Sequence, residues 1–500
     1  MIVDSKQLPV GWSVSTIEEI AEVNPRLNKA GIPDDLFVSF VPMPAVGAAD
    51  GSIDVSGERL FREVKKGFTS FQEGDVLFAK ITPCMENGKM AIVPKVKNAL
   101  GFGSTEFHVL RPKEGIDARY IYYYVSSKNF RGEAERYMSG AVGQKRVTTP
   151  YLKESKIPVA PLEQQKRIVA EIEKQFSRLD EAVANLKRVK ANLKRYKAAV
   201  LKAAVEGKLT EKWREEQAAK LEAQGSANAA GDTKSGAALE TAEELLKRIL
   251  AERRQKWEEA ELAKMEANGK APKDDKWKKK YKEPAKPDTT SLPELPEGWN
   301  WVSMDSLIVW GPQNGLYLPK TAYKPGIAIL RIDDYQDGQS REVAGLQQVE
   351  TTEENIERYG LELNDLIINR VNSPSHLGKC IVIKDRNLPS LFESNMMRLK
   401  LAFSVRAGYI ELYFHSKSGK TRIIENAKWA VNQASINQGD VSMTAVPLPP
   451  EKEQELIINE VESKLAIVAG IEGLLETNMR RSERLRQSIL SKAFSGQIIN

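Results

Sequence analysis

The stretch IPVAPLEQQKRIVAEIE, residues Ile157–Glu173, decides the fold because the chain repeats it as VPLPPEKEQELIINEVE at Val446–Glu462. In both copies prolines precede a polar run whose apolar residues recur at steps of three or four, which is typical of a helix start. The match extends without gaps from residues 117–209 to residues 406–498. A chain of 500 residues is too long for one core, so the repeat predicts a tandem duplication.

Two further matches occur in the same order along the chain. LPVGW at Leu8–Trp12 returns as LPEGW at Leu295–Trp299. GDVLFAKITPCMENGKMAIV at Gly74–Val93 aligns with NDLIINRVNSPSHLGKCIVI at Asn364–Ile383. Each of these longer copies reads as strand, loop, strand, because β-branched runs flank a cluster of turn-forming residues. The predicted order is therefore globular domain, helix, globular domain, helix.

The long amphipathic segments predict a coiled coil. From Ile168 to Val200 the apolar residues are spaced by three or four, whereas Asn478 and Ser482 interrupt the same seam in the second copy. A helix of this length cannot bury its apolar stripe against one small domain. We expect the two helices of the chain to pair antiparallel with each other; the alternative is a coiled coil between two chains.

These patterns predict an α+β fold in which two duplicated mixed α/β domains are separated by two long helices that form an antiparallel coiled coil. We predict a first domain, a first long helix, a connector, a second domain and a second long helix, with the following boundaries: 1–155, 156–209, 210–294, 295–445 and 446–500.

The connector has no counterpart in the repeat. Its AQGSANAAGDTKSGA segment, residues 223–237, is typical of a flexible linker. Residues 241–267 read as a helix in which Thr241 and Glu244 form a capping box. Residues 270–282 then hold seven lysines and two aspartates. This lysine-rich stretch either contacts DNA phosphates or is a solvated connector, and the sequence leaves both open.

Composition and motifs argue for a binding protein. No apolar run is long enough to cross a bilayer, and no apolar signal core begins the chain, so we expect a cytoplasmic location. Two cysteines and three histidines offer no metal-ligand spacing, and we expect the histidines at the surface. The sequence shows no phosphate loop, no dinucleotide fingerprint and no adenine-methyltransferase tetrapeptide. The basic run at residues 186–202, with seven cations and no acid, suits a polyanion such as nucleic acid.

Taken as a set, these motifs resemble the specificity subunits of type I restriction–modification systems. The resemblance rests on the two LPxGW openings, on GDVLFAK with a later GK, on GSTEFHVLRP at Gly103–Pro112, and on LKAAVEGKLT closing the first helix. It covers nearly the whole chain. It implies that each half carries a target-recognition domain for one part of a split, asymmetric DNA sequence, and that the coiled coil sets the gap between the two parts.

The resemblance also implies partners and the absence of catalysis in this chain. Two modification subunits would bind the helices and methylate adenine N6 with S-adenosylmethionine, and two motor-nuclease subunits would cleave unmodified DNA with ATP and Mg. The chain itself would hold no cofactor or metal. Two other interpretations stay open: a coiled-coil adaptor that binds only proteins, and an enzyme with an unrecognised site, such as a single-chain methyltransferase.

Candidate DNA contacts lie in two loops of each domain, since Arg, Lys, Asn and Gln read base edges and Lys, Arg, Ser and Thr hold phosphates. In the first domain they are Lys80, Thr82, Asn87, Lys89, Gln144, Lys145, Arg146 and Thr148. In the second they are Arg370, Asn372, Ser373, Lys379, Asn432, Gln433, Ser435 and Asn437. Lys89 and Lys379 each follow a turn glycine, so they could instead only solvate that turn. Gln144 and Gln433 are identical between the halves, which favours a structural or phosphate role over base reading.

Overall fold

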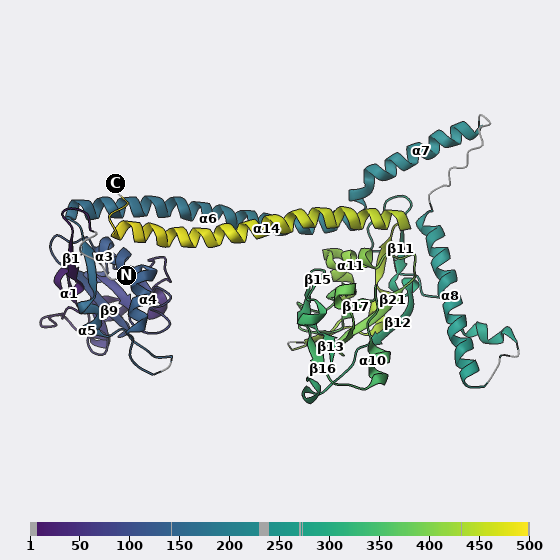
Figure 1. The fold of residues 1–500 in the computed structure, drawn as a ribbon, viewed down its shortest axis with the longest axis horizontal. Coiled ribbons are helices and arrows are strands. Elements are labelled where there is room, and N and C mark those ends of the chain that lie inside the picture. Colours follow the sequence, from purple (N-terminus) through teal and green to yellow (C-terminus); the bar gives the residue numbers. More distant parts are fainter. Residues whose placement is uncertain are drawn as a thin grey trace. The chain divides into compact units, whose positions relative to one another are not determined.

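The computed structural model describes residues 8–141, 143–229, 240–269, 272, 274–431 and 433–498 of the chain, and for residues 221–229 the backbone only. The fold divides into two compact units (Figure 1). Unit 1 takes residues 1–189 with 473–500, and unit 2 takes residues 190–472. Each unit therefore combines one globular domain with segments of both long helices.

Unit 1 is built on two four-stranded sheets. The first has the strand order β2-β9-β6-β7 with antiparallel neighbours: β2 (Ala21–Val23), β9 (Phe107–Pro112), β6 (Val76–Ala79) and β7 (Met90–Ile92). The second has the order β4-β3-β8-β5, in which β3 and β8 run parallel: β4 (Glu58–Leu60), β3 (Phe37–Val41), β8 (Gly101–Gly103) and β5 (Thr69–Phe71). All four residues of β6 are buried, which is why its sequence VLFA is wholly apolar.

Short helices and a strand pair complete the first domain. The helices are α1 (Ile17–Ile20), α2 (Phe61–Val64), α3 (Ala118–Ser126), α4 (Lys128–Arg136) and α5 (Thr149–Glu154). Strand β1 (Ser13–Thr16) pairs antiparallel with β10 (Lys156–Val159). Residues 156–159, which the sequence boundary assigned to the long helix, therefore form a strand, because Pro158 fits an extended backbone and the helix begins only after Pro161.

Unit 2 repeats the main sheet in the order β12-β21-β17-β19. Its strands are β12 (Ile308–Asn314), β21 (Met396–Leu401), β17 (Leu366–Asn369) and β19 (Cys380–Val382). A second sheet has the order β16-β13-β20, with β13 and β20 parallel: β16 (Gln347–Val349), β13 (Ile327–Leu330) and β20 (Ser390–Phe392). The remaining pairs are β11 (Asn300–Ser303) with β24 (Ala445–Leu448), and β14 (Tyr335–Gln336) with β15 (Gln339–Ser340).

The helices of the second domain follow the same scheme. They are α9 (Met304–Leu307), α10 (Glu353–Tyr359), α11 (Ala407–His415), α12 (Lys417–Ile423) and α13 (Gln438–Met443). The internal hydrogen bonds repeat as well. The buried Tyr120 hydroxyl donates to the Pro158 carbonyl at 2.8 Å, and the Tyr409 hydroxyl donates to the Pro447 carbonyl at 2.9 Å. The duplication read from the sequence is thus also a duplication of side-chain contacts.

The two long helices are α6 (Leu162–Val205) and α14 (Glu451–Phe494), each of 44 residues. In unit 1 the start of α6, through Ile168 and Ile172, shares a core with Leu490 near the end of α14. In unit 2 the end of α6, through Val200, shares a core with Ile457 near the start of α14. The helices of one chain therefore pair antiparallel within each unit, as the fold prediction required (Figure 1).

Ion pairs add to this helix pairing. In unit 1 Arg486 on α14 bonds to Asp180 on α6, and in unit 2 Lys197 lies 2.8 Å from Glu472. α6 ends at Val205 and is followed by Gly207, whose φ of 71° lies in the left-handed region that glycine favours.

Each LPxGW motif lies where one long helix begins and the other ends. The Trp12 indole donates to Gln164 in the first turn of α6 at 2.9 Å, and a Cβ placed on Gly496, after α14, would lie 2.1 Å from Pro9. In unit 2 the Trp299 indole donates to Glu453 at 2.8 Å. There a Cβ on Gly207, after α6, would lie 2.5 Å from Pro296. Proline packs against a glycine that cannot be enlarged, so the motif locks each domain onto both helices.

The connector is more helical than its sequence predicted. α7 (Glu211–Ala229) covers residues 223–229, which were expected to be linker, because the strong helix formers that precede them continue the helix. Residues 230–237 of the expected linker lie outside the described part of the chain. The predicted capping box is present: α8 (Ala242–Ala267) begins with reciprocal hydrogen bonds between Thr241 and Glu244.

Among the described residues, no helix is long and apolar enough to cross a membrane. The same residues contain no group of three or more His, Cys, Asp or Glu side chains arranged to hold a metal ion.

Candidate nucleic-acid interface

The fold brings the two candidate loops of the first domain together. They are residues 80–89, between β6 and β7, and residues 139–148, before α5. Ile81 and Arg146 form an antiparallel bridge, and Ser139 bridges Arg146 from the other side. The Val147 amide donates to the Lys80 carbonyl at 2.8 Å, and the Thr82 amide donates to the Lys145 carbonyl at 3.0 Å. Backbone hydrogen bonds therefore join the loops into one ribbon, which we call the first reading ribbon.

The second domain builds the same ribbon from the matching positions. β18 (Val371–Asn372), β23 (Gln433–Ser435) and β22 (Lys428–Ala430) form a three-stranded sheet with β23 in the centre. The Ile436 amide donates to the Arg370 carbonyl at 2.9 Å, as Val147 does to Lys80. This is the second reading ribbon. Asn432 lies outside the described residues.

Arg146 is held in place by an acidic neighbour in the first ribbon. Its Nε and Nη2 donate to Glu106 at 2.9 Å each, and its Nη1 donates to the Gln144 carbonyl at 3.0 Å. These charge-assisted bonds raise the pKa of Arg146 and lower the pKa of Glu106. About 40% of the Arg146 side chain stays exposed, so its guanidinium is fixed in orientation and still accessible.

The other side chains of the first ribbon differ in exposure. Gln144, Lys145 and Asn87 are exposed. Lys80 is half-buried, and this desolvation lowers the pKa of its ammonium, with Glu106 opposing the shift and Arg146 adding to it. The hydroxyl of Thr82 donates to the Lys145 carbonyl at 3.2 Å, which fixes the ribbon rather than presenting a donor to a ligand.

The second ribbon offers a less basic set. Gln433 is exposed, and Ser435 and Asn372 are half-buried. Asn372 accepts from the Ser373 amide at 2.7 Å, and the Ser373 hydroxyl lies 3.1 Å from that of Ser375. Nη1 of Arg370 donates to the Ser394 carbonyl at 3.3 Å. The position of Arg146 is taken by Ser435, so the second ribbon has no arginine held by a carboxylate at this position.

Lys89 and Lys379 have the same structural task in the two domains. The Lys89 ammonium donates to the carbonyls of Met43 and Val46 at 3.2 and 2.8 Å. The Lys379 ammonium donates to the Ile332 carbonyl at 2.8 Å. Both lysines thus tie the strand after the turn glycine to a neighbouring loop, which is more than solvation of the turn; their contact with DNA stays a prediction.

Thr148 and Asn437 cap matching helices. Thr148 precedes α5 and accepts from the Tyr151 amide at 3.4 Å, while Asn437 precedes α13 and accepts from the Asp440 amide at 3.0 Å. Their side chains therefore define where each ribbon turns into a helix.

Comparisons with known proteins agree with this geometry. The model of the type I restriction modification DNA specificity domain matches residues 9–195. The specificity subunit of the type I restriction enzyme EcoAI of Escherichia coli is 28% identical, and the alignment covers 98% of this chain and 83% of that protein. The corresponding EcoEI subunit is 26% identical with the same coverage.

This chain belongs to the type I restriction–modification specificity-subunit family. Solved structures share the fold of this specificity subunit. One, from work on complex assembly and conformational transition of the type I R-M system, has a TM-score of 0.63 at 20% identity, covering 98% of this chain and 99% of that chain. The HsdS subunit from Thermoanaerobacter tengcongensis has a TM-score of 0.55 at 18% identity, covering 99% and 100%.

The structure adds residues to the first ribbon that the sequence did not indicate. A surface pocket of about 600 Å³ beside the ribbon is lined by Thr82 and Lys145 and also by Arg136, in the last turn of α4. Arg136 is exposed and could hold a phosphate. The only sequence signal is a basic residue at a helix end, which is equally typical of charge–dipole stabilisation.

The second ribbon carries exposed apolar side chains that a search for hydrogen-bonding residues would miss. Trp429 is 58% exposed and Val431 is 92% exposed, both within or next to β22. Exposed apolar groups that lie close together can mark a surface that binds a ligand. In a DNA groove they could contact a thymine methyl group or stack on a base.

The sequence predicted that the histidines of the specificity subunit lie at the surface. The structure instead buries one of them. His108 is buried, with one ring nitrogen 2.8 Å from the Val147 carbonyl and the other 3.1 Å from Nδ2 of the Asn24 side chain. Burial lowers its pKa to about 4, so it is neutral near pH 7. His108 therefore supports the first ribbon from beneath, and His415 is bonded to the Cys380 carbonyl at 3.2 Å.

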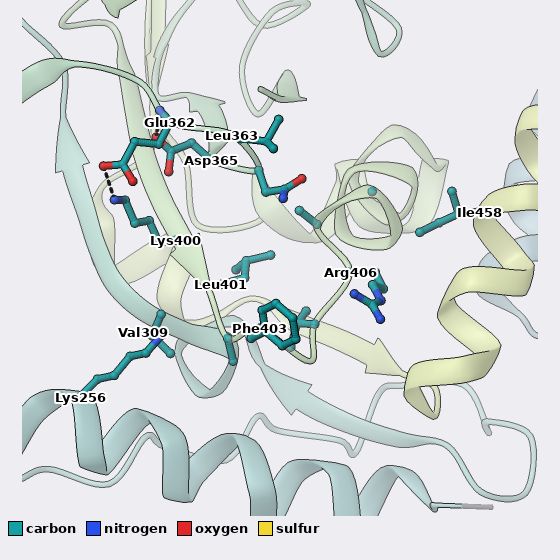
Figure 2. A pocket seen from close by; sticks show the side chains of 15 residues that line it. Lys256, Val309, Glu362, Leu363, Asp365, Lys400, Leu401, Phe403, Arg406 and Ile458 are labelled. Carbon is teal, nitrogen blue, oxygen red and sulfur yellow. Dashed lines mark hydrogen bonds and ion pairs between the residues drawn. The ribbon is translucent and has the colours of Figure 1, made fainter. Parts of the chain in front are cut away.

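A pocket of about 640 Å³ in unit 2 is lined by residues outside the reading ribbons, and Figure 2 shows their side chains. Its charged side chains already have partners: Lys400 bonds to Glu362, and Arg406 bonds to Glu451 and Glu455. Its wall includes Phe403, which is 81% exposed. This pocket has the character of an apolar surface between paired charges rather than of a reaction centre.

Proposed function

We propose that this specificity subunit reads an asymmetric, two-part DNA target, with one half-site for each reading ribbon. The observation that carries the proposal is the contrast within the repeat. Scaffold bonds such as Tyr120–Pro158 and Tyr409–Pro447 are the same, while the ribbon residues Lys145 and Arg146 of the first domain are replaced by Ala434 and Ser435 in the second. Equal scaffolds with unequal reading side chains suit two different half-sites.

We further propose that the subunit directs chemistry performed by other chains. In this scheme two modification subunits methylate adenine N6 with S-adenosylmethionine, and two restriction subunits use ATP and Mg to cleave unmodified DNA. The specificity subunit itself holds no catalytic group or cofactor. The support is that its relatives over 98% of the chain are specificity subunits of restriction enzymes.

The long helices are the proposed docking surface for the modification subunits. In unit 1 Leu474 is 65% exposed and Leu485 is 45% exposed, and in unit 2 Ile467 is 64% exposed and Tyr196 is 47% exposed. Apolar residues exposed along a paired helix favour a further helix packed against them.

A protein-only adaptor is the competing function, since the same helices would serve it. The two functions differ in what the ribbons do. An adaptor needs no exposed cation beside an oriented arginine, as Lys145 and Arg146 provide, and it would bind no DNA in a salt-dependent way.

The test is to express the subunit with the modification subunits of a type I system that assemble with it, and to sequence methylated bases in the host genome. We expect methylated adenines in one motif made of two short, unlike half-sites separated by a fixed unspecified gap. Methylation of adenines in unrelated sequences that share no motif would contradict the proposal. So would a complex that assembles but methylates no adenine.

A further inference from the structure

The lysine-rich part of the connector is an ordered element of unit 2. Residues 274–282, which we call the lysine hook, include a 3-10 helix at Asp275–Lys280. Trp277 is buried and stacks on Trp257 of α8, with ring centroids 5.9 Å apart, and Tyr281 contacts the same ring at 5.3 Å. Aromatic contacts thus hold the hook against α8 in a defined conformation.

α8 in turn is fixed to the second recognition domain (Figure 1). Leu245 and Ile249 are fully buried in the core of unit 2. Arg253 donates to the Ile308 carbonyl at 3.2 Å, to Asp305 at 3.1 Å and to the Tyr281 hydroxyl at 2.9 Å. The Arg253 side chain thus links the end of the hook to the first residue of β12.

The charges of the hook are divided between structural and free lysines. Lys278 is paired with Glu258 at 3.3 Å, and Lys276 is paired with Asp274 at 3.2 Å. Lys279, Lys280 and Lys282 are exposed and have no ion-pair partner among the described residues. The hook therefore presents three free ammonium groups on a backbone whose position is already fixed.

The strand to which the hook is bonded also contacts α13, the helix that follows the second reading ribbon. β12 begins at Ile308, beside Arg253, and the Pro312 carbonyl further along accepts from Gln438 at 2.7 Å. Gln438 follows Asn437, one of the candidate contacts. Four residues of strand span about 13 Å, which is less than one turn of a DNA duplex at about 34 Å. The point where Arg253 anchors the hook and the start of α13 therefore lie within the length of one duplex turn.

We infer that the lysine hook is a sequence-independent contact to the DNA backbone that serves the second half-site only. The inference rests on the proposed DNA-reading function and assigns a part of the chain that has no counterpart in the first half. Lysine ammonium groups hold phosphates as point charges and carry no base information. The hook would raise affinity for the second half-site without changing which bases are read there.

The experiment compares the assembled methyltransferase complex carrying Lys279→Ala, Lys280→Ala and Lys282→Ala with the parent complex. Equilibrium binding is measured between about 50 and 200 mM salt on a duplex carrying the methylated motif and on a scrambled duplex. We expect the log–log salt slope to become shallower by about 0.9 for each lost phosphate contact, up to about 2.7, on both duplexes. The methylation motif should stay the same. The matched Lys→Arg triple variant, which keeps the charges, should keep the parent slope.

Two outcomes would overturn the inference. One is an unchanged slope in the alanine variant, which would mean that the three lysines contact no DNA. The other is a defect that appears only when the motor-nuclease subunit is added, which would make the hook a protein interface. If the parent complex itself bound both duplexes without salt dependence, the proposed function would fail, not only this inference.

Discussion

The indole nitrogen of Trp299 donates to one oxygen of Glu453, while the other oxygen of that carboxylate accepts from Thr210 at 2.6 Å and from Arg214. Glu453 is fully buried, at the first turn of α14. One carboxylate thus joins the entrance of the second domain, the start of one long helix and the segment that follows the other. In unit 1 the matching position is Gln164, which bonds to Trp12.

This asymmetry predicts unequal effects of two matched substitutions. Glu453→Ala leaves the cation of Arg214 without its buried partner, and we expect it to lower the free energy of unfolding of unit 2 by about 3–5 kcal/mol. Gln164→Ala removes one neutral hydrogen bond and should cost about 1 kcal/mol. Urea unfolding of the full chain checks both values, and equal costs for the two variants would contradict the assignment.

Lys145 and Arg146 should affect DNA binding in different ways. Lys145→Ala removes an exposed, unoriented cation, so we expect a salt slope shallower by about 0.9 with an unchanged motif. Arg146→Ala removes a guanidinium that Glu106 orients, so we expect relaxed recognition at one position of the first half-site, at about 1–3 kcal/mol. Salt-dependent binding and methylated-base sequencing measure the two effects. The second half-site is the internal control. If either variant changed it, the separate roles of Lys145 and Arg146 in the first half-site would be contradicted.

The glycine–lysine turns predict a stability effect rather than a binding effect. Lys379→Ala removes an ammonium that bonds to the Ile332 carbonyl and lies 4.6 Å from the ring centroid of Tyr335. We expect a loss of about 1–2 kcal/mol in the stability of unit 2 and an unchanged salt slope. Lys89→Ala should do the same in unit 1. A shallower slope with unchanged stability would restore these lysines to the list of DNA contacts.

Lengthening both long helices should lengthen the gap between half-sites. Insertion of one heptad into α6 and one into α14 keeps the apolar seam in register and adds about 10 Å of helix. At about 3.4 Å per base pair, we expect a gap longer by about three base pairs with both half-sites unchanged. Methylated-base sequencing reads the motif directly. A gap of the original length in an active complex would exclude the helices as the element that sets it.

Glu411 predicts a pH dependence of stability. Its carboxyl is buried in α11, where desolvation raises its pKa to about 7, although the Val382 amide donates to it at 3.1 Å. Between pH of about 4.5 and about 7 the folded state keeps a proton that the unfolded state releases, so this group makes the protein less stable as pH rises, by at most about 3 kcal/mol.

The Glu411→Gln variant isolates that contribution. His108 and His415, with lowered pKa values, make stability rise with pH and therefore act in the opposite direction. The measured quantity is the difference in unfolding free energy between Glu411→Gln and the parent at pH 5, 6, 7 and 8. It should increase up to about pH 7 and then level off, and a difference independent of pH would contradict the raised pKa.

Much of the fold could be predicted because its signals are periodic or repeated. The apolar steps from Ile168 to Val200 identify α6, and the gapless repeat of residues 117–209 identifies the second domain and α14 without any knowledge of packing. Thr241 and Glu244 located the start of α8 because a capping box is a local interaction. Residues 156–159 were assigned to a helix because their partner strand, β1, is 140 to 146 residues away in sequence.

The reading surface was predictable only as a pair of loops. Sequence placed Lys80 and Arg146 among the candidates but could not show that Glu106 orients the arginine, since that contact joins residues 40 positions apart in the chain. Lys89 was a candidate DNA contact because of its charge. Its ammonium instead donates to two backbone carbonyls that lie more than 40 residues away in sequence. Trp429 was missed because an exposed tryptophan and a core tryptophan look the same in one sequence.

Hydrogen bonds from Val147 to Lys80 and from Ile436 to Arg370 join the two loops of each ribbon. They also constrain how a new DNA specificity can evolve. A substitution in one loop moves the backbone on which the other loop's side chains stand, so the energetic effects of changes in the two loops are coupled rather than additive. Point mutations would then pass through intermediates that bind neither the old nor the new half-site well. A new specificity is reached more readily by recombination that exchanges both loops of a domain in one event.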